Sequence, residues 1–82
     1  MLKRGSVVIS LRGRDSERMM AVLEVTPDGV WVADGRKRPI QRPKCKNPRH
    51  LAPVGAVVGE SSMATNRELR RALAAAATIQ GQ

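Results

Sequence analysis

The chain has 82 residues, enough for one small domain with a modest core but not for a deep substrate cleft. Fifteen basic against seven acidic residues give a net charge of +8, which favours polyanionic partners such as nucleic acid. No apolar run approaches the roughly 20 residues of a membrane-spanning helix, no secretory signal is visible, and one cysteine excludes an internal disulfide, so we expect a cytoplasmic protein without a membrane partner.

Three apolar runs in residues 6–33 predict β-strands. Ser6–Leu11 is rich in the β-branched side chains that strands favour. A glycine-containing loop at Arg12–Asp15 separates this run from Arg18–Val25, whose period does not distinguish strand from helix. We interpret the second run as a strand because it is short and because the turn sequence Thr26–Gly29 follows it. Val30–Ala33 is the third strand.

The next element is predicted from the pair Asp34-Gly35, which is typical of a two-residue hairpin turn. The chain should therefore return over Arg36–Gln41 as an antiparallel strand with a basic outer face, and Leu51–Val54 should add a last short strand. Several short strands joined by tight turns indicate a small all-β barrel or sandwich, and a barrel is favoured because closure removes exposed edges. Trp31, the single aromatic residue, is expected to plug the barrel core, the alternative being an exposed stacking surface.

The composition changes after Val54, which divides the chain into a barrel over 1–54, a linker over 55–64 and a helical tail over 65–82. The linker is predicted because Gly55–Met63 is rich in glycine and serine. Thr65 and Glu68 fit a capping box, and strong helix propensity follows over Arg67–Thr78.

The predicted helix has one thin apolar stripe, formed by Leu69, Leu73 and Ala76. With this stripe the helix would dock on the barrel, bind a partner or fray, because about a dozen residues are marginally stable as an isolated helix.

The most informative stretch is Asp34–Leu51. Seven cations and no acid lie between Arg36 and Arg49, and three prolines interrupt any helix. An extended basic ribbon suits a phosphate backbone; the alternative is a solvated edge that discourages aggregation. Because natural surfaces intersperse both signs of charge, we favour phosphate binding. The predicted RNA-contacting residues of this stretch are Arg36, Lys37, Arg38, Arg42, Lys44, Lys46, Asn47, Arg49 and His50.

A second contact is predicted at Arg12 and Arg14, which flank Gly13. The alternative is a turn in which Asp15 bonds the local backbone or pairs with Arg14. If both segments lie on one side of the barrel, they form one continuous cationic surface. Asn47 is the only side chain in the basic stretch suited to bidentate recognition of a base, so sequence specificity should be low.

Catalytic and metal-binding functions are disfavoured by the residues present. Cys45 and His50 are five apart, but zinc needs three or four ligands and the chain has no second Cys or His. A Cys–His nucleophilic pair would lack a third group and an oxyanion motif. We therefore expect no enzyme activity, no metal, no cofactor and no small-molecule substrate.

Three motifs occur in sequence order. They are Gly5-x-Val7-Val8-x-Ser10 followed by Gly13-Arg14-Asp15, then Val32-Ala33-Asp34-Gly35-x-x-Arg38, and then Pro43-Lys44-x-Lys46-Asn47-x-x-His50-Leu51. Together they resemble the bacterial KOW-domain RNA-binding proteins, which are similar to ribosomal proteins of the large subunit. The resemblance covers residues 3–54 and leaves the C-terminal third unmatched. It implies a five-stranded SH3-like barrel that binds RNA or the ribosome without catalysis. A KOW motif usually has a further glycine soon after Asp15, and this chain has none there.

The expected function is therefore non-enzymatic binding of structured RNA, with ribosomal RNA as the target and ribosomal proteins as further partners in translation. The scarcity of aromatic residues favours folded RNA over splayed single strands. The alternative is a protein-interaction adaptor that recruits an acidic or helical partner through the barrel or through the Leu69/Leu73 face of the helix.

Overall fold

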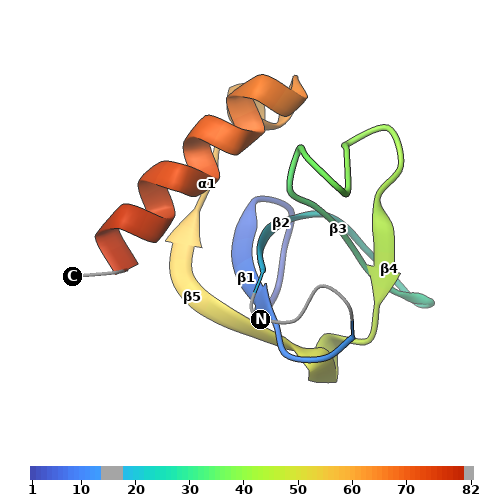
Figure 1. The fold of residues 1–82 in the computed structure, drawn as a ribbon. Helices are drawn as coiled ribbons and strands as arrows, with labels where there is room; N and C mark the ends of the chain where they lie inside the picture. Colours follow the sequence, from blue (N-terminus) through green and yellow to red (C-terminus); the bar gives the residue numbers. More distant parts are fainter. Residues whose placement is uncertain (14–17, 81–82) are drawn as a thin grey trace.

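The computed structural model describes residues 1–13 and 18–80 (Figure 1). Five strands precede one long helix, and two short 3-10 helices lie between the later elements. The elements are β1 (Ser6–Ser10), β2 (Met19–Thr26), β3 (Gly29–Ala33), β4 (Lys44–Lys46), η1 (Pro48–His50), β5 (Leu51–Val57), η2 (Glu60–Met63) and α1 (Asn66–Gln80).

The strands form one antiparallel sheet in the order β4-β3-β2-β1-β5. The sheet bends strongly, so that its two edge strands β4 and β5 approach each other through η1, as in a small barrel (Figure 1). A five-stranded antiparallel sheet followed by a C-terminal helix is thus confirmed, but the fourth strand is β4 rather than the predicted Arg36–Gln41. β5 is longer than the expected Leu51–Val54.

The predicted hairpin after β3 is wrong. Residues 36–41 form a loop rather than a strand, and the antiparallel partner of β3 is β4, with Val32 opposite Lys44 and Trp31 opposite Cys45. Both faces of the central strands are covered, and this explains their ambiguous sequence period. Strands that are buried on both faces form continuous apolar runs instead of alternating ones.

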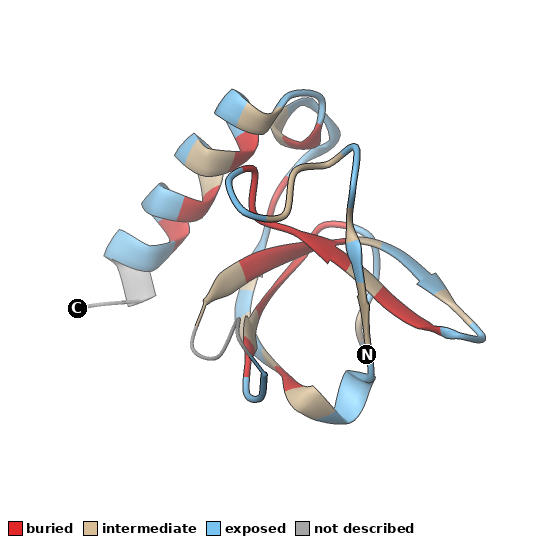
Figure 2. Cartoon of the chain, turned by 45° about the vertical axis from the view of Figure 1, so that its right-hand side comes forward, coloured by how far each residue is buried: buried red, intermediate tan, exposed pale blue. Residues whose placement is uncertain are grey.

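The two faces of the sheet belong to two hydrophobic clusters (Figure 2). Inside the bend lie Val8, Met20, Val22, Val30, Val32 and Leu51. On the other face, Val7, Ala21 and Ala33 pack with Val58, Met63, Leu69, Leu73 and Ala76.

The helix docks on the sheet through the predicted stripe. Leu69 is fully buried, and Leu73 and Ala76 are nearly so. The capping prediction is confirmed on its first half, because the Thr65 Oγ1 accepts a hydrogen bond from the Glu68 N–H over 3.1 Å. The helix starts one residue earlier and ends two residues later than expected.

Residues 55–64 do not form the predicted linker. They contain the end of β5, the buried Val58 and η2, whose Met63 packs against the helix side of the sheet. An ion pair also holds η2 to the N-terminal segment, with the Arg4 Nε 2.8 Å from the Glu60 Oε2. The helix and the strands therefore share one core.

Trp31 is not the predicted core plug. It is half-buried, belongs to neither hydrophobic cluster, and donates a long 3.3 Å hydrogen bond from Nε1 to the Thr26 Oγ1. The interior is filled by aliphatic side chains instead.

Candidate functional site

The predicted basic ribbon is divided between two places in the structure. Residues 36–42, here called the cationic loop, lie beside the start of α1 (Figure 1). Residues 44–50 follow the loop in the chain and form β4 and η1. The cations that form one run in the sequence are therefore divided between this loop and the β4–η1 segment.

The cationic loop is built on the buried carboxylate of Asp34. Its Oδ1 accepts hydrogen bonds from the backbone N–H groups of Arg36 (2.8 Å) and Arg38 (3.0 Å). The N–H groups of Asp34 and Gly35 both donate to the Arg38 carbonyl oxygen. The second carboxylate oxygen of Asp34 lies 3.1 Å from the Arg18 Nη1. This network closes a turn where the pair Asp34-Gly35 had predicted a hairpin.

The first turns of α1 fix the other side of the loop. The Asn66 Oδ1 accepts from the Ile40 N–H over 2.8 Å, and its Nδ2 donates to the Gln41 Oε1 over 2.8 Å. Arg70 donates from Nη1 to the Gly35 carbonyl oxygen over 2.8 Å. Gly35 has φ +80°, and a Cβ there would lie 2.6 Å from the Asn66 carbonyl oxygen, so glycine is required for this close approach.

A second group of predicted residues lines a shallow depression of about 320 Å³, here called the cationic cleft. The loop after β1 reaches it because the Leu11 N–H donates to the His50 carbonyl oxygen over 2.7 Å. A Cβ at Gly13 would lie 3.8 Å from the Lys46 Nζ, so the two segments are in contact distance. The residues that line the cleft are Arg12, Gly13, Lys44, Cys45, Lys46, Asn47 and His50.

The short helix η1 forms one wall of the cationic cleft. Asn47 caps it, with Oδ1 accepting from the Arg49 N–H over 2.9 Å, and Pro48 supplies the fixed φ of the first position. This cap occupies one of the two lone pairs of the Asn47 amide oxygen and fixes the orientation of the amide. Arg49 is exposed on η1 but does not line the cleft.

The structure brings some of the predicted residues together and separates others. It brings Arg12 to Lys44, Lys46, Asn47 and His50, although more than thirty residues separate them in the chain. It places the cations of residues 36–42 on the loop beside α1. Arg14 and the missing KOW glycine after Asp15 lie outside the described residues.

Most of these cations form no ion pair with a carboxylate of the described residues. Within the described ranges, ion pairs join Arg4 to Glu60, Arg18 to Asp34, and Arg71 to Glu68. The candidate cations that form no ion pair with a described residue are Arg12, Arg36, Lys37, Arg42, Lys44 and Arg49. Their charge is therefore available to a polyanion.

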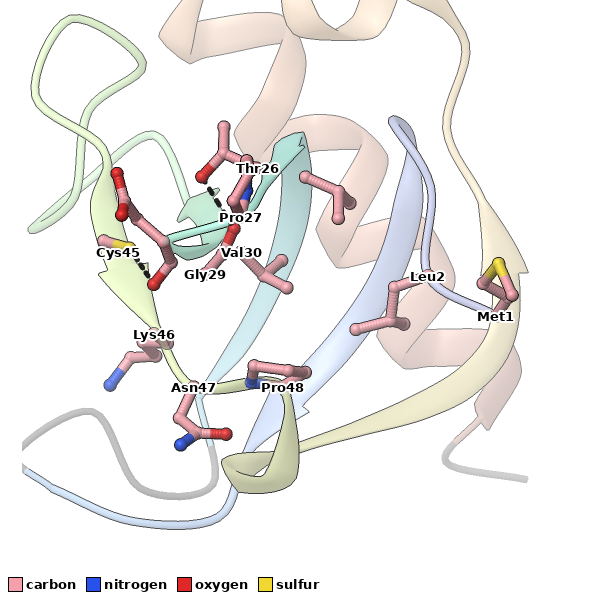
Figure 3. A pocket seen from close by; sticks show the side chains of 12 residues that line it. Met1, Leu2, Thr26, Pro27, Gly29, Val30, Cys45, Lys46, Asn47 and Pro48 are labelled. Atoms are coloured by element: carbon pink, nitrogen blue, oxygen red, sulfur yellow. Dashed lines mark hydrogen bonds between the residues drawn. The ribbon is translucent and has the colours of Figure 1, made fainter.

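Sequence reasoning missed two features around these surfaces. Arg70 of α1 reaches the cationic loop at the Gly35 carbonyl oxygen, and only the docking of α1 reveals this. An apolar hollow of about 470 Å³ also opens beside the cationic cleft (Figure 3). No sequence pattern could have shown it, because its walls come from the N-terminal segment, the β2–β3 turn and the β4–η1 junction.

The remaining expectations concern metals, membranes and the helix face. Across residues 1–13 and 18–80, no group of three potential ligands is placed to hold a metal ion. In the same ranges, no helix is long and apolar enough to cross a membrane. The Leu69/Leu73 face is covered by the sheet, so a partner could reach it only if α1 undocked.

The chain was compared with models of protein families and with curated proteins. No family model and no curated protein matches it.

Proposed function

We propose that the chain is a non-enzymatic RNA-binding module of the KOW type, an SH3-like barrel that docks on structured RNA, with ribosomal RNA as its target. The observation that carries the proposal is the cationic cleft, in which Arg12 and Gly13 of one loop meet Lys44, Lys46 and His50 of β4 and η1. Separate segments converge there on one concave, positively charged surface.

The charge of the cleft matches a sugar-phosphate backbone. Arg12 and Lys44 are exposed and form no ion pair with a described carboxylate. Each phosphate that such a cation neutralises releases counterions, which gives a log-log slope of affinity against salt of roughly −0.7 to −0.9 per contact. Binding should therefore be tight in dilute buffer and weaken steeply as salt is added.

The scarcity of aromatic residues favours folded RNA over single strands. The chain has one aromatic residue, and that residue, Trp31, is half-buried and outside the cationic cleft. Proteins that bind single strands rely on several aromatic rings for stacking. Charge and shape must therefore supply most of the affinity here. A surface that binds by charge and shape recognises helical and looped RNA through its backbone.

The test is binding of a fluorescently labelled RNA hairpin, measured by anisotropy over a salt series. The double variant Arg12→Glu/Lys44→Glu reverses two exposed cations of the cleft and should abolish binding at moderate salt. The matched control is Lys3→Glu/Arg71→Glu, which changes the net charge equally at exposed positions outside the cleft and the cationic loop. Equal losses in the two variants would show non-specific attraction only and would overturn the proposal.

The hairpin titration of the unmodified protein also distinguishes RNA binding from the adaptor alternative. An adaptor that binds an acidic protein would leave the hairpin unbound even in dilute buffer. Sedimentation of the tagged protein with ribosomal particles across the same salt series then tests the ribosomal target. Failure of the protein to sediment with them at low salt would contradict that part of the proposal.

A further inference from the structure

In Figure 3 the apolar hollow opens on the other side of the β4 backbone from the end of the Lys46 side chain, and Asp28 is the acidic residue that lines it. Leu2, Val30 and Pro48 face it from three separate segments of the chain. Gly29, at the end of the β2–β3 turn, packs closely against β4, because a Cβ there would lie 2.8 Å from the Cys45 Sγ and 2.9 Å from the Lys46 carbonyl oxygen. The hollow is thus enclosed on the β4 side by tightly packed backbone and open to solvent on the other.

The hollow carries exposed apolar surface that the fold itself does not cover. Val25 is 50 % exposed and Met1 is fully exposed, and both line it. Covering such surface is favourable by about 25 cal/mol per Å² of apolar area removed from water. A ligand with an apolar face would therefore gain affinity here.

The hollow and the cationic cleft share one wall. Cys45, Lys46 and Asn47 line both depressions. In Figure 3 the side chains of Lys46 and Asn47 extend away from the apolar floor at Val30. A ligand that crosses this wall meets an apolar surface on one side and the cleft with its exposed cations Arg12 and Lys44 on the other.

We propose that the apolar hollow takes a single nucleobase extruded from the RNA whose phosphates the cationic cleft binds. The inference rests on the proposed function and adds the feature that the target RNA should present, an unpaired base beside a paired stem. A nucleotide has a flat apolar face joined to an anionic phosphate, which is the combination that the shared wall separates. The charge of Arg12 and Lys44, the exposed cations of the cleft beyond the wall, favours this occupant over an uncharged apolar peptide.

The affinity test uses three RNA hairpins of identical stem. One is fully paired, one carries a single-nucleotide bulge, and one carries the same bulge with an abasic sugar. The last two have equal charge and differ only in the base. The bulged hairpin should bind about tenfold more tightly than the abasic one, which corresponds to about 1.4 kcal/mol. Equal affinity for these two hairpins would overturn the inference.

The site is located with a variant and a chemical reporter. Val25→Ser, at a half-exposed position, should remove the difference between bulged and abasic hairpins and leave binding of the paired hairpin unchanged. The single cysteine of the chain, Cys45, lines the hollow, so its alkylation by iodoacetamide should be slowed more by saturating bulged hairpin than by saturating abasic hairpin. Equal protection by both would contradict the placement of the base.

The two proposals fail in different ways. If the paired hairpin does not bind in dilute buffer, the proposed RNA-binding function is wrong. If it binds with the expected salt dependence but the base of the bulge adds nothing, only the inference about the hollow is wrong. Protection of Cys45 by an acidic peptide with leucine side chains, without protection by the bulged hairpin, would also overturn the inference.

Discussion

The Asn66 Oδ1 accepts a hydrogen bond from the backbone N–H of Ile40 over 2.8 Å, across 26 positions of the sequence. Through this contact the first residue of α1 holds the end of the cationic loop. This ordering of the loop is a role of the helix that its composition did not indicate. The helix covers one face of the sheet through Leu69, and it also orders the loop through Asn66 and Arg70.

Replacing Asn66 should loosen the cationic loop. Asn66→Ala leaves the partly buried Ile40 amide without its acceptor, which should cost about 1 kcal/mol of the free energy of unfolding. Hydrogen exchange at the Ile40 amide should accelerate. Asn66→Asp keeps an oxygen at this position and is the matched control. If the Ile40 amide exchanged equally in all three proteins, the contact would have no role in ordering the loop.

Asp34 should be the most sensitive polar position of the loop. Asp34→Ala removes the acceptor of two backbone amides and the ion partner of Arg18, so we expect a loss of about 2–3 kcal/mol in urea unfolding. Asp34→Asn keeps an oxygen acceptor for the amides but replaces the acceptor of the Arg18 guanidinium by an NH2 donor, so it should destabilise the fold less than alanine does. An alanine variant as stable as the asparagine variant would contradict the network described for this turn.

The helix face should behave as a core. Leu69 is fully buried, and Leu69→Ala should destabilise the fold by about 2–5 kcal/mol in chemical denaturation. Leu73→Glu would place a carboxylate in the same cluster and should prevent docking of α1, so it does not report on partner binding alone. Ala77→Ser, on the exposed side of α1, is the control and should change stability by less than about 0.5 kcal/mol.

The ion pair of Arg4 and Glu60 should give a small pH dependence. Hydrogen bonds from the Arg4 guanidinium lower the pKa of Glu60 below its ordinary value of 4.5. Because the folded pKa is the lower one, the stabilisation is present above the ordinary value and is lost as pH falls through the folded pKa. Glu60→Gln should therefore lower the urea midpoint slightly at pH 7, and the difference should shrink in acid. A difference that stayed constant across this pH range would contradict the ion pair.

The two cationic surfaces should contribute separately to the salt dependence of RNA binding. Arg36→Gln/Lys37→Gln in the loop and Arg12→Gln/Lys44→Gln in the cleft should each reduce the slope by roughly 0.7–0.9 for every phosphate that the variant no longer neutralises. The combined variant should show the sum of the two reductions, because the surfaces are built by different segments. An unchanged slope in the loop variant would restrict RNA contact to the cleft. Anisotropy titrations at four or more salt concentrations measure these slopes.

The sequence determined the elements that depend on local chemistry. Three strands follow from apolar runs bounded by turn residues, and the start of α1 follows from the capping pair Thr65 and Glu68. The positive charge of residues 36–49 is also a property of the sequence alone. Each of these depends on side chains that lie within a few positions of one another.

Only the tertiary structure decided where the chain turns after β3 and where its cations lie. Asp34-Gly35 is compatible with a tight hairpin, but the Asp34 carboxylate binds the amides of Arg36 and Arg38 and α1 holds Ile40, so a loop forms. The predicted linker became part of the core because Val58 and Met63 find apolar partners on the sheet.

The cationic cleft and the apolar hollow were likewise beyond local reasoning. Arg12 and Lys44 line one cleft because the Leu11 N–H donates to the His50 carbonyl oxygen, and Leu2 and Pro48 line one hollow although 46 positions separate them in the chain. Contacts between residues far apart in the chain depend on how the strands pack, and packing is a property of the whole sheet and helix. The sequence determined which charges the protein carries, and the bend of the sheet decided which of them share a surface.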